Sequence, residues 1–135
     1  MKIEPLTPII GAEIQGLNAA ALSDQEFDAL FQAFTDHSVV FLKEQPALTA
    51  EEHSAFAQRF GSIHVHPASR GRPADVLGAM KMRTHEESEV AAGNRWHSDV
   101  SCDELPPQAS ILQLNNLPEN GGDTLFASLY AAYDT

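Results

Sequence analysis

The stretch Trp96-His97-Ser98-Asp99 decides the interpretation of this 135-residue chain. In a β-strand, residues i and i+2 point to the same face, so the imidazole of His97 and the carboxylate of Asp99 would converge. They would be two of the three protein ligands of a 2-His-1-carboxylate facial triad, which holds non-haem Fe(II) and leaves coordination positions open. A His-x-Asp tripeptide alone is a weak signal, because a surface His beside a turn-capping Asp has the same pattern. The remaining segments must decide between these two interpretations.

Composition and charge narrow the class of protein. Hydrophobic residues make up 43% and charged residues 20%, which is typical of a soluble globular chain and predicts one domain over 1–135. The formal net charge of −11 argues against binding to nucleic acid or to an anionic membrane. No apolar run approaches the ~20 residues of a membrane span, and the N-terminus has no signal-peptide pattern, so we expect a cytoplasmic protein. The single cysteine, Cys102, excludes an internal disulfide, and we expect it to pack in the core as a small thiol.

Two capping boxes predict two helices. Ser23 and Glu26 form the first box, and apolar residues at i, i+3, i+4 and i+7 behind it predict a helix over 24–36. Thr49 and Glu52 form the second box, which an apolar stripe also follows. Both stripes are interpreted as core packing and not as cofactor sites.

Strand signals occur on both sides of these helices. Residues 2–10 contain two prolines and predict an edge strand, whereas the β-branched and aromatic run over 39–42 predicts a buried strand. Two further strands are predicted over 109–114 and 123–127, followed by a short helix that Ser128 would cap. The pattern predicts an α+β fold whose second half is β-rich and antiparallel and packs against a partner sheet.

Six stretches of the chain, taken in order, resemble one known family. They are Val39-Val40-Phe41-Leu42, Gln58-Arg59-Phe60-Gly61, His64-Val65-His66-Pro67, Trp96-His97-Ser98-Asp99-Val100-Ser101, Pro106-Pro107 and Gly121-Gly122-Asp123-Thr124-Leu125-Phe126. They are similar to the taurine dioxygenase-like family of Fe(II)- and 2-oxoglutarate-dependent oxygenases. The resemblance covers almost the whole chain, and the combination of His-x-Asp with Gly-Gly-Asp-Thr at this spacing is specific. It implies a double-stranded β-helix (jelly-roll) fold with flanking helices.

The resemblance also implies roles for individual residues. His97 and Asp99 would be the iron ligands, and Thr124 would donate a hydrogen bond to the distal carboxylate of 2-oxoglutarate. His66 matches a position that contacts the substrate sulfonate, and Asn94 lies close to a second substrate-contacting position. The implied cofactors are Fe(II) and 2-oxoglutarate, and the implied partners are O2, a small and sulfonate-like anionic substrate, and a second copy of the chain in a homo-oligomer.

The family's third iron ligand is a distal His, followed by an Arg that pairs with 2-oxoglutarate, and both lie beyond the Gly-Gly-Asp-Thr turn. The chain is therefore interpreted as the N-terminal half of such an enzyme, incomplete at the C-terminus and inactive alone. One alternative is a non-catalytic module that binds partners or self-associates through unpaired strand edges. Another is a metal-binding domain without redox chemistry that uses His64, His66, His97 and Asp99. For His64 and His66 themselves, a polar pocket or a local hydrogen bond is favoured over a metal site.

Overall fold

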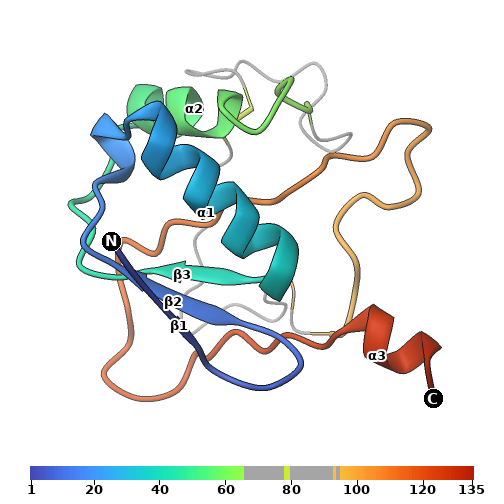
Figure 1. Cartoon of the computed structure of the whole chain (residues 1–135). Coiled ribbons are helices and arrows are strands. Elements are labelled where there is room, and N and C mark those ends of the chain that lie inside the picture. Colours follow the sequence, from blue (N-terminus) through green and yellow to red (C-terminus); the bar gives the residue numbers. More distant parts are fainter. Residues whose placement is uncertain (66–77, 80–92, 94) are drawn as a thin grey trace. The chain divides into compact units, whose positions relative to one another are not determined.

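The structure, a computed structural model, describes residues 1–65, 78–79, 93 and 95–135 (Figure 1). The chain divides into two compact units. The first consists of Met1–Leu48 together with Gln113–Thr135, and the second of Thr49–Leu112. In the part of the chain that is described, none of the helices combines the length and the hydropathy needed to cross a bilayer.

A three-stranded mixed sheet forms the centre of the first unit. Its strands are β1 (Lys2–Pro5), β2 (Ala12–Gln15) and β3 (Val40–Leu42), in the order β1-β2-β3. β1 runs antiparallel to β2 and places Ile3 opposite Ile14, while β3 runs parallel to β2 and places Leu42 opposite the same Ile14. Strands form in both predicted segments, each shorter than its sequence signal, and the edge strand β1 is confirmed. The prediction of a buried strand over 39–42 is wrong, because β3 lies at the other edge of the sheet, where Phe41 is 38% exposed and its two neighbours are only half-buried. The central strand β2 is therefore paired on both edges.

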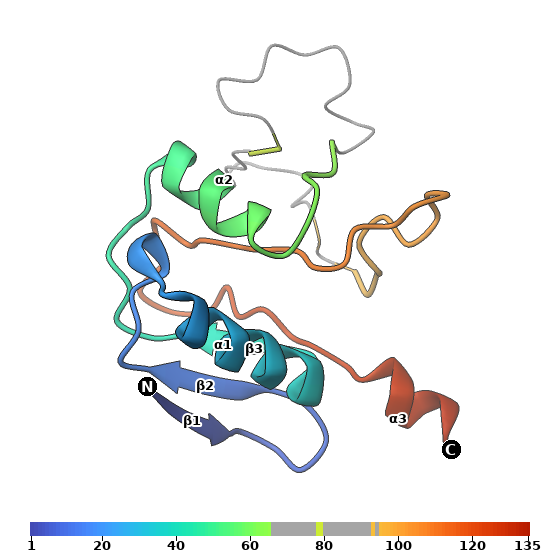
Figure 2. The same ribbon diagram turned by 45° about the horizontal axis from the view of Figure 1, so that its top comes forward.

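The helix α1 (Asp24–His37) connects the two parallel strands, after a short 3₁₀ turn, η1 (Ala19–Ala21). Its N-terminus carries the predicted capping box, in which the Ser23 hydroxyl accepts from the Glu26 amide and Glu26 accepts from the Ser23 amide. Ser38 ends the helix in the left-handed conformation, with a φ of +63°. Figure 2 shows α1 lying across one face of the sheet, and it packs against both β2 and β3. The predicted helix over 24–36 is confirmed.

The core of the first unit lies between this helix and β2. Its buried apolar residues are Ala12, Ile14, Leu17, Ala19, Leu30 and Ala33. Along β2 the buried residues alternate with half-buried Glu13 and Gln15, which is the period of a strand with one covered face. The phenylalanines of the α1 stripe are half-buried and contact one another through their rings, with centroids 6.0 Å apart for Phe27 and Phe31. The stripe therefore serves packing, as the sequence indicates.

Gln113 and Phe126 supply two contacts that attach the C-terminal segment to the rest of the first unit. The Gln113 side-chain amide pairs with the Leu48 backbone as a neighbouring strand would: its Oε1 accepts from the Leu48 amide at 2.8 Å and its Nε2 donates to the Leu48 carbonyl at 3.1 Å. Further along, the rings of Phe126 and Phe41 meet edge to face at 5.8 Å. The segment ends in the predicted helix α3 (Leu129–Tyr133), capped by Ser128.

The predicted antiparallel second half is wrong for the described residues. No strand is present among them after Leu42, and the segments 109–114 and 123–127 are irregular. A strand exists only when a neighbour supplies its ladder of backbone hydrogen bonds, and an apolar alternation does not supply that neighbour. The described fold is a small mixed sheet with helices, and the double-stranded β-helix stays a prediction.

The second unit is organised by the helix α2 (Ala50–Gln58), which begins at the predicted capping box of Thr49. Phe56 is buried, and its ring meets that of Phe60 edge to face at 5.5 Å. Cys102 is exposed in this unit, so the prediction of a core-packing thiol is wrong. It lies in a turn between two polar neighbours, Ser101 and Asp103, and not in an apolar segment.

Candidate metal centre

His97 and Asp99 converge in the structure, but not on a strand. The His97 Nε2 atom lies 3.2 Å from Asp99 Oδ1, although residues 96–100 are irregular. The expectation of a strand is therefore wrong, while the expectation that the two side chains meet is right. Local hydrogen bonds, and not the pleat of a strand, bring them together.

The His97 ring is oriented by a backbone carbonyl. Its Nδ1 lies 2.7 Å from the Arg95 oxygen. A carbonyl oxygen can only accept a hydrogen bond, so Nδ1 carries a proton and donates it. The second ring nitrogen, Nε2, then presents its lone pair on the side of Asp99. This arrangement is the usual one for metal-binding histidines, in which a hydrogen bond to one nitrogen aims the other at the ion.

The pair has the donor chemistry of two neighbouring metal ligands. An imidazole lone pair and a carboxylate oxygen facing each other attract a cation or a shared proton. Two ligands in neighbouring positions of a six-coordinate ion, each about 2.1 Å from it, would lie about 3.0 Å apart. The observed 3.2 Å is close to that value. Both side chains are about half exposed, at 55% and 53%, which leaves room for further ligands.

The turn after Asp99 has an unusual backbone. Val100 has a φ of +48°, the left-handed region that a β-branched residue rarely adopts and that costs about 1–2 kcal/mol. Two contacts close this turn. The Asp103 amide donates to the Val100 carbonyl at 3.1 Å, and the hydroxyls of Ser98 and Ser101 lie 2.6 Å apart.

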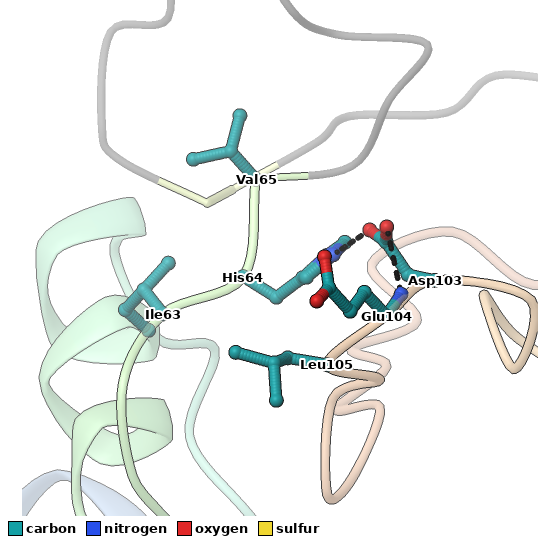
Figure 3. Close-up of a pocket in the computed structure, with 6 residues that line it drawn as sticks. All are labelled: Ile63, His64, Val65, Asp103, Glu104 and Leu105. Atoms are coloured by element: carbon teal, nitrogen blue, oxygen red, sulfur yellow. Dashed lines mark hydrogen bonds and ion pairs between the residues drawn. The ribbon is translucent and has the colours of Figure 1, made fainter.

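A second histidine–carboxylate pair stabilises the far end of this turn. His64 Nε2 lies 2.8 Å from Asp103 Oδ2, across 39 residues of sequence, and both side chains are more than two-thirds covered. The pair lines a pocket of about 360 Å³ (Figure 3). The pocket is lined by Ile63, His64, Val65, Asp103, Glu104 and Leu105. The interpretation of His64 as a pocket residue is confirmed, because its ring nitrogen is engaged by a carboxylate.

Only two of the predicted site residues, His97 and Asp99, lie together among the residues that the structure describes. His66 and Asn94 lie outside the described residues, so their substrate-binding roles stay predictions. Thr124 belongs to the other unit, where it is exposed in an irregular segment, and its role also stays a prediction. Among the described residues, no three His, Cys, Asp or Glu side chains cluster closely enough to hold a metal ion. His97 and Asp99 are thus a pair of donors and not a complete set.

A family model described as "Taurine catabolism dioxygenase TauD, TfdA family" matches residues 2–135. The chain belongs to this family. The resemblance inferred from the six sequence stretches is confirmed by that match. His97 and Asp99 are the candidate metal-binding pair of this TauD/TfdA family chain, and the Arg95 carbonyl orients the His97 ring.

Three curated relatives of this TauD/TfdA family chain cover nearly all of it. The "Alkylsulfatase" of Acinetobacter baylyi is 33% identical over 135 residues, which are 99% of this chain and 41% of the relative. The "Alpha-ketoglutarate-dependent sulfate ester dioxygenase" of Pseudomonas putida is 32% identical, over 98% of this chain and 43% of its own length. The "Alpha-ketoglutarate-dependent sulfonate dioxygenase" of Saccharomyces cerevisiae is 29% identical, over 99% and 35%. The chain spans less than half the length of these relatives.

Sequence reasoning missed the residues that support the pair. The Arg95 carbonyl leaves no trace in the sequence, since every residue has one. Gly93 has a φ of +85°, a conformation that favours glycine, so a glycine near a metal motif was an available signal. His64 and Asp103 are too far apart in sequence for any local pattern to pair them.

Proposed function

We propose that this chain contributes two iron ligands, His97 and Asp99, to a Fe(II)- and 2-oxoglutarate-dependent dioxygenase. The observation that carries the proposal is the approach of His97 Nε2 to Asp99 Oδ1, within a chain that belongs to the TauD/TfdA family. The fold proposed for the longer enzyme is the double-stranded β-helix with flanking helices. A third ligand and an Arg partner of 2-oxoglutarate would complete the site, as the resemblance to the family implies.

The chain's own residues have definable tasks in this reaction. Bound Fe(II) and 2-oxoglutarate would supply the oxidation of the substrate by O2. His97 would offer Nε2 because the Arg95 carbonyl holds Nδ1 as a donor. Asp99 would offer one carboxylate oxygen and offset part of the ion's charge. Thr124 would donate its hydroxyl proton to the distal carboxylate of 2-oxoglutarate, without adding a charge.

The proposed substrate is a small organic anion with a sulfonate-like or sulfate-like group. Two relatives are described as acting on sulfonates and on sulfate esters, which supports this class. His66 and Asn94 would contact that group, as the resemblance to the family implies. A histidine suits an anionic group because either ring nitrogen can donate a hydrogen bond.

Metal titration tests the proposal without any need for turnover. The purified chain is titrated anaerobically with Fe(II), and in parallel with Co(II), and binding is followed by calorimetry. We expect His97→Ala and Asp99→Ala each to lower the affinity by about tenfold or more, since each removes one of two donors. His53→Ala, a change of the same type on α2, is the matched control and should bind like the wild type. Equal affinities for all four proteins would overturn the proposal.

A second candidate function, self-association, is favoured by the exposed apolar side chains near the C-terminus. Leu125, Leu129, Tyr130 and Tyr133 are between 72% and 90% exposed. Such a concentration of large apolar side chains is typical of an interaction surface. A module of this kind would oligomerise with rising concentration in the absence of metal, which sedimentation velocity measures. A monomer over the whole accessible range of concentration would contradict this candidate.

A further inference from the structure

The turn that follows the candidate ligands contains a backbone conformation that must be stabilised by its surroundings. Val100 directly follows Asp99 and has a φ of +48°. A strained residue persists only where neighbouring contacts over-determine it, and such residues concentrate at functional sites. If Val100 relaxed to an ordinary extended conformation, the backbone that orients Asp99 would rotate with it.

The contacts that oppose this relaxation lead to His64. The carbonyl of Val100 accepts from the Asp103 amide at 3.1 Å, which closes the turn. The carboxylate of Asp103 is in turn 2.8 Å from His64 Nε2, and its other oxygen accepts from the Glu104 amide at 3.2 Å. Figure 3 shows the His64 ring directed at the Asp103 carboxylate. His64 belongs to a different segment, which follows α2, so it connects the turn to the rest of its unit.

We propose that His64 and Asp103 are a positioning pair that stabilises the strained turn at Val100 and thereby orients Asp99 for metal binding. The proposal rests on the function proposed above. His64 is not a ligand in this account, because its Nε2 is engaged by Asp103. The pair acts through the backbone, from Asp103 to Val100 to Asp99.

The test is a double-mutant cycle on metal affinity in the full chain. Outer partners of metal ligands typically change affinity by about 10- to 100-fold when they are lost, so His64→Ala should weaken Co(II) binding by about tenfold. His64→Gln should bind within about twofold of the wild type, since a glutamine amide can donate from nearly the same position. His53→Ala is the matched control. Far-UV circular dichroism checks that each variant retains the helix content of the wild type.

The second arm of the cycle separates positioning from a general effect on stability. Glycine adopts positive φ without strain, so Val100→Gly should preserve the turn even when His64 is absent. We therefore expect His64→Ala to lower Co(II) affinity much less in the Val100→Gly background than in the wild type. A residue that merely stabilised the fold would have the same effect in both backgrounds.

The outcomes distinguish this inference from the function on which it rests. If Asp99→Ala binds Co(II) like the wild type, the metal centre itself is overturned, and the positioning role with it. If Asp99→Ala loses binding but His64→Ala does not, only the positioning role is overturned. Equal losses on His64→Ala in the wild-type and Val100→Gly backgrounds would also overturn it, because the strained turn would then carry no part of the effect.

Discussion

Ile3 and Ile14, which are paired across strands β1 and β2, allow the energetic contribution of the core to be measured on two matched side chains. Ile14 is 0% exposed and Ile3 is 38% exposed, although they occupy directly opposite positions on β2 and β1. Changing either to alanine removes three carbon groups, worth about 0.8 kcal/mol each when fully buried, or roughly 2.4 kcal/mol. At Ile14 a cavity term adds to this, since α1 covers that face, so Ile14→Ala should cost about 3–4 kcal/mol.

Ile3→Ala should cost much less. Its side chain is only partly removed from water, so the transfer contribution is about 1.5 kcal/mol, and no closed cavity is left behind. Urea unfolding followed by circular dichroism measures both values, and the difference should be about 2 kcal/mol, with Ile14→Ala the more destabilising change. If Ile3→Ala cost as much as Ile14→Ala, the assignment of the core to the space between α1 and β2 would be refuted.

Two further predictions concern the attachment of the C-terminal segment and the first helix cap. Gln113→Ala removes both hydrogen bonds to the Leu48 backbone, so it should lower the free energy of unfolding by about 1–2 kcal/mol and speed hydrogen exchange of the Leu48 amide. Gln32→Ala, at an exposed position of α1, is the control and should have neither effect. The pKa of Glu26 is lowered from its ordinary value of 4.5, first by the Ser23 hydroxyl and then by the Ser23 amide. Its stabilising contribution is therefore complete above pH 4.5 and is lost as the pH falls through the lowered pKa. Thermal unfolding of the wild type should lose more stability than Glu26→Gln between about pH 6 and pH 3, and equal losses would contradict the cap geometry.

Local signals predicted the helices well because their determinants are local. Ser23 with Glu26 begins α1 at the expected residue, and the apolar stripe carries it to His37, one residue beyond the predicted end. A helix closes its own hydrogen bonds, so its sequence contains what it needs. The same reason explains the success of the Ser128 cap.

Strands in the second half were not predictable in this way. The segments 109–114 and 123–127 have apolar β-type sequences, yet neither is a strand in the structure. Their ladders depend on partners distant in sequence, and composition alone cannot show whether a partner is present. The pairing of Gln113 with the Leu48 backbone uses a side chain that no strand pattern indicates.

In the candidate site too, the local feature was predictable from the sequence and the contacts between distant residues were not. The i, i+2 spacing of His97 and Asp99 was enough to predict that they meet, although the backbone that brings them together is a turn and not a strand. The contacts that support these two side chains could not be predicted from the sequence. A backbone carbonyl at Arg95 has no signature, and the pairing of His64 with Asp103 spans 39 residues.

The role of Asp99 as a metal ligand is tested by comparing the Fe(II) affinity of the chain with that of Asp99→Ala. We expect a loss of about tenfold or more, because Asp99 supplies one of the two converging donors. If the Asp99→Ala variant bound Fe(II) as tightly as the wild type, the approach of His97 to Asp99 would be an ordinary surface contact and not part of a metal site.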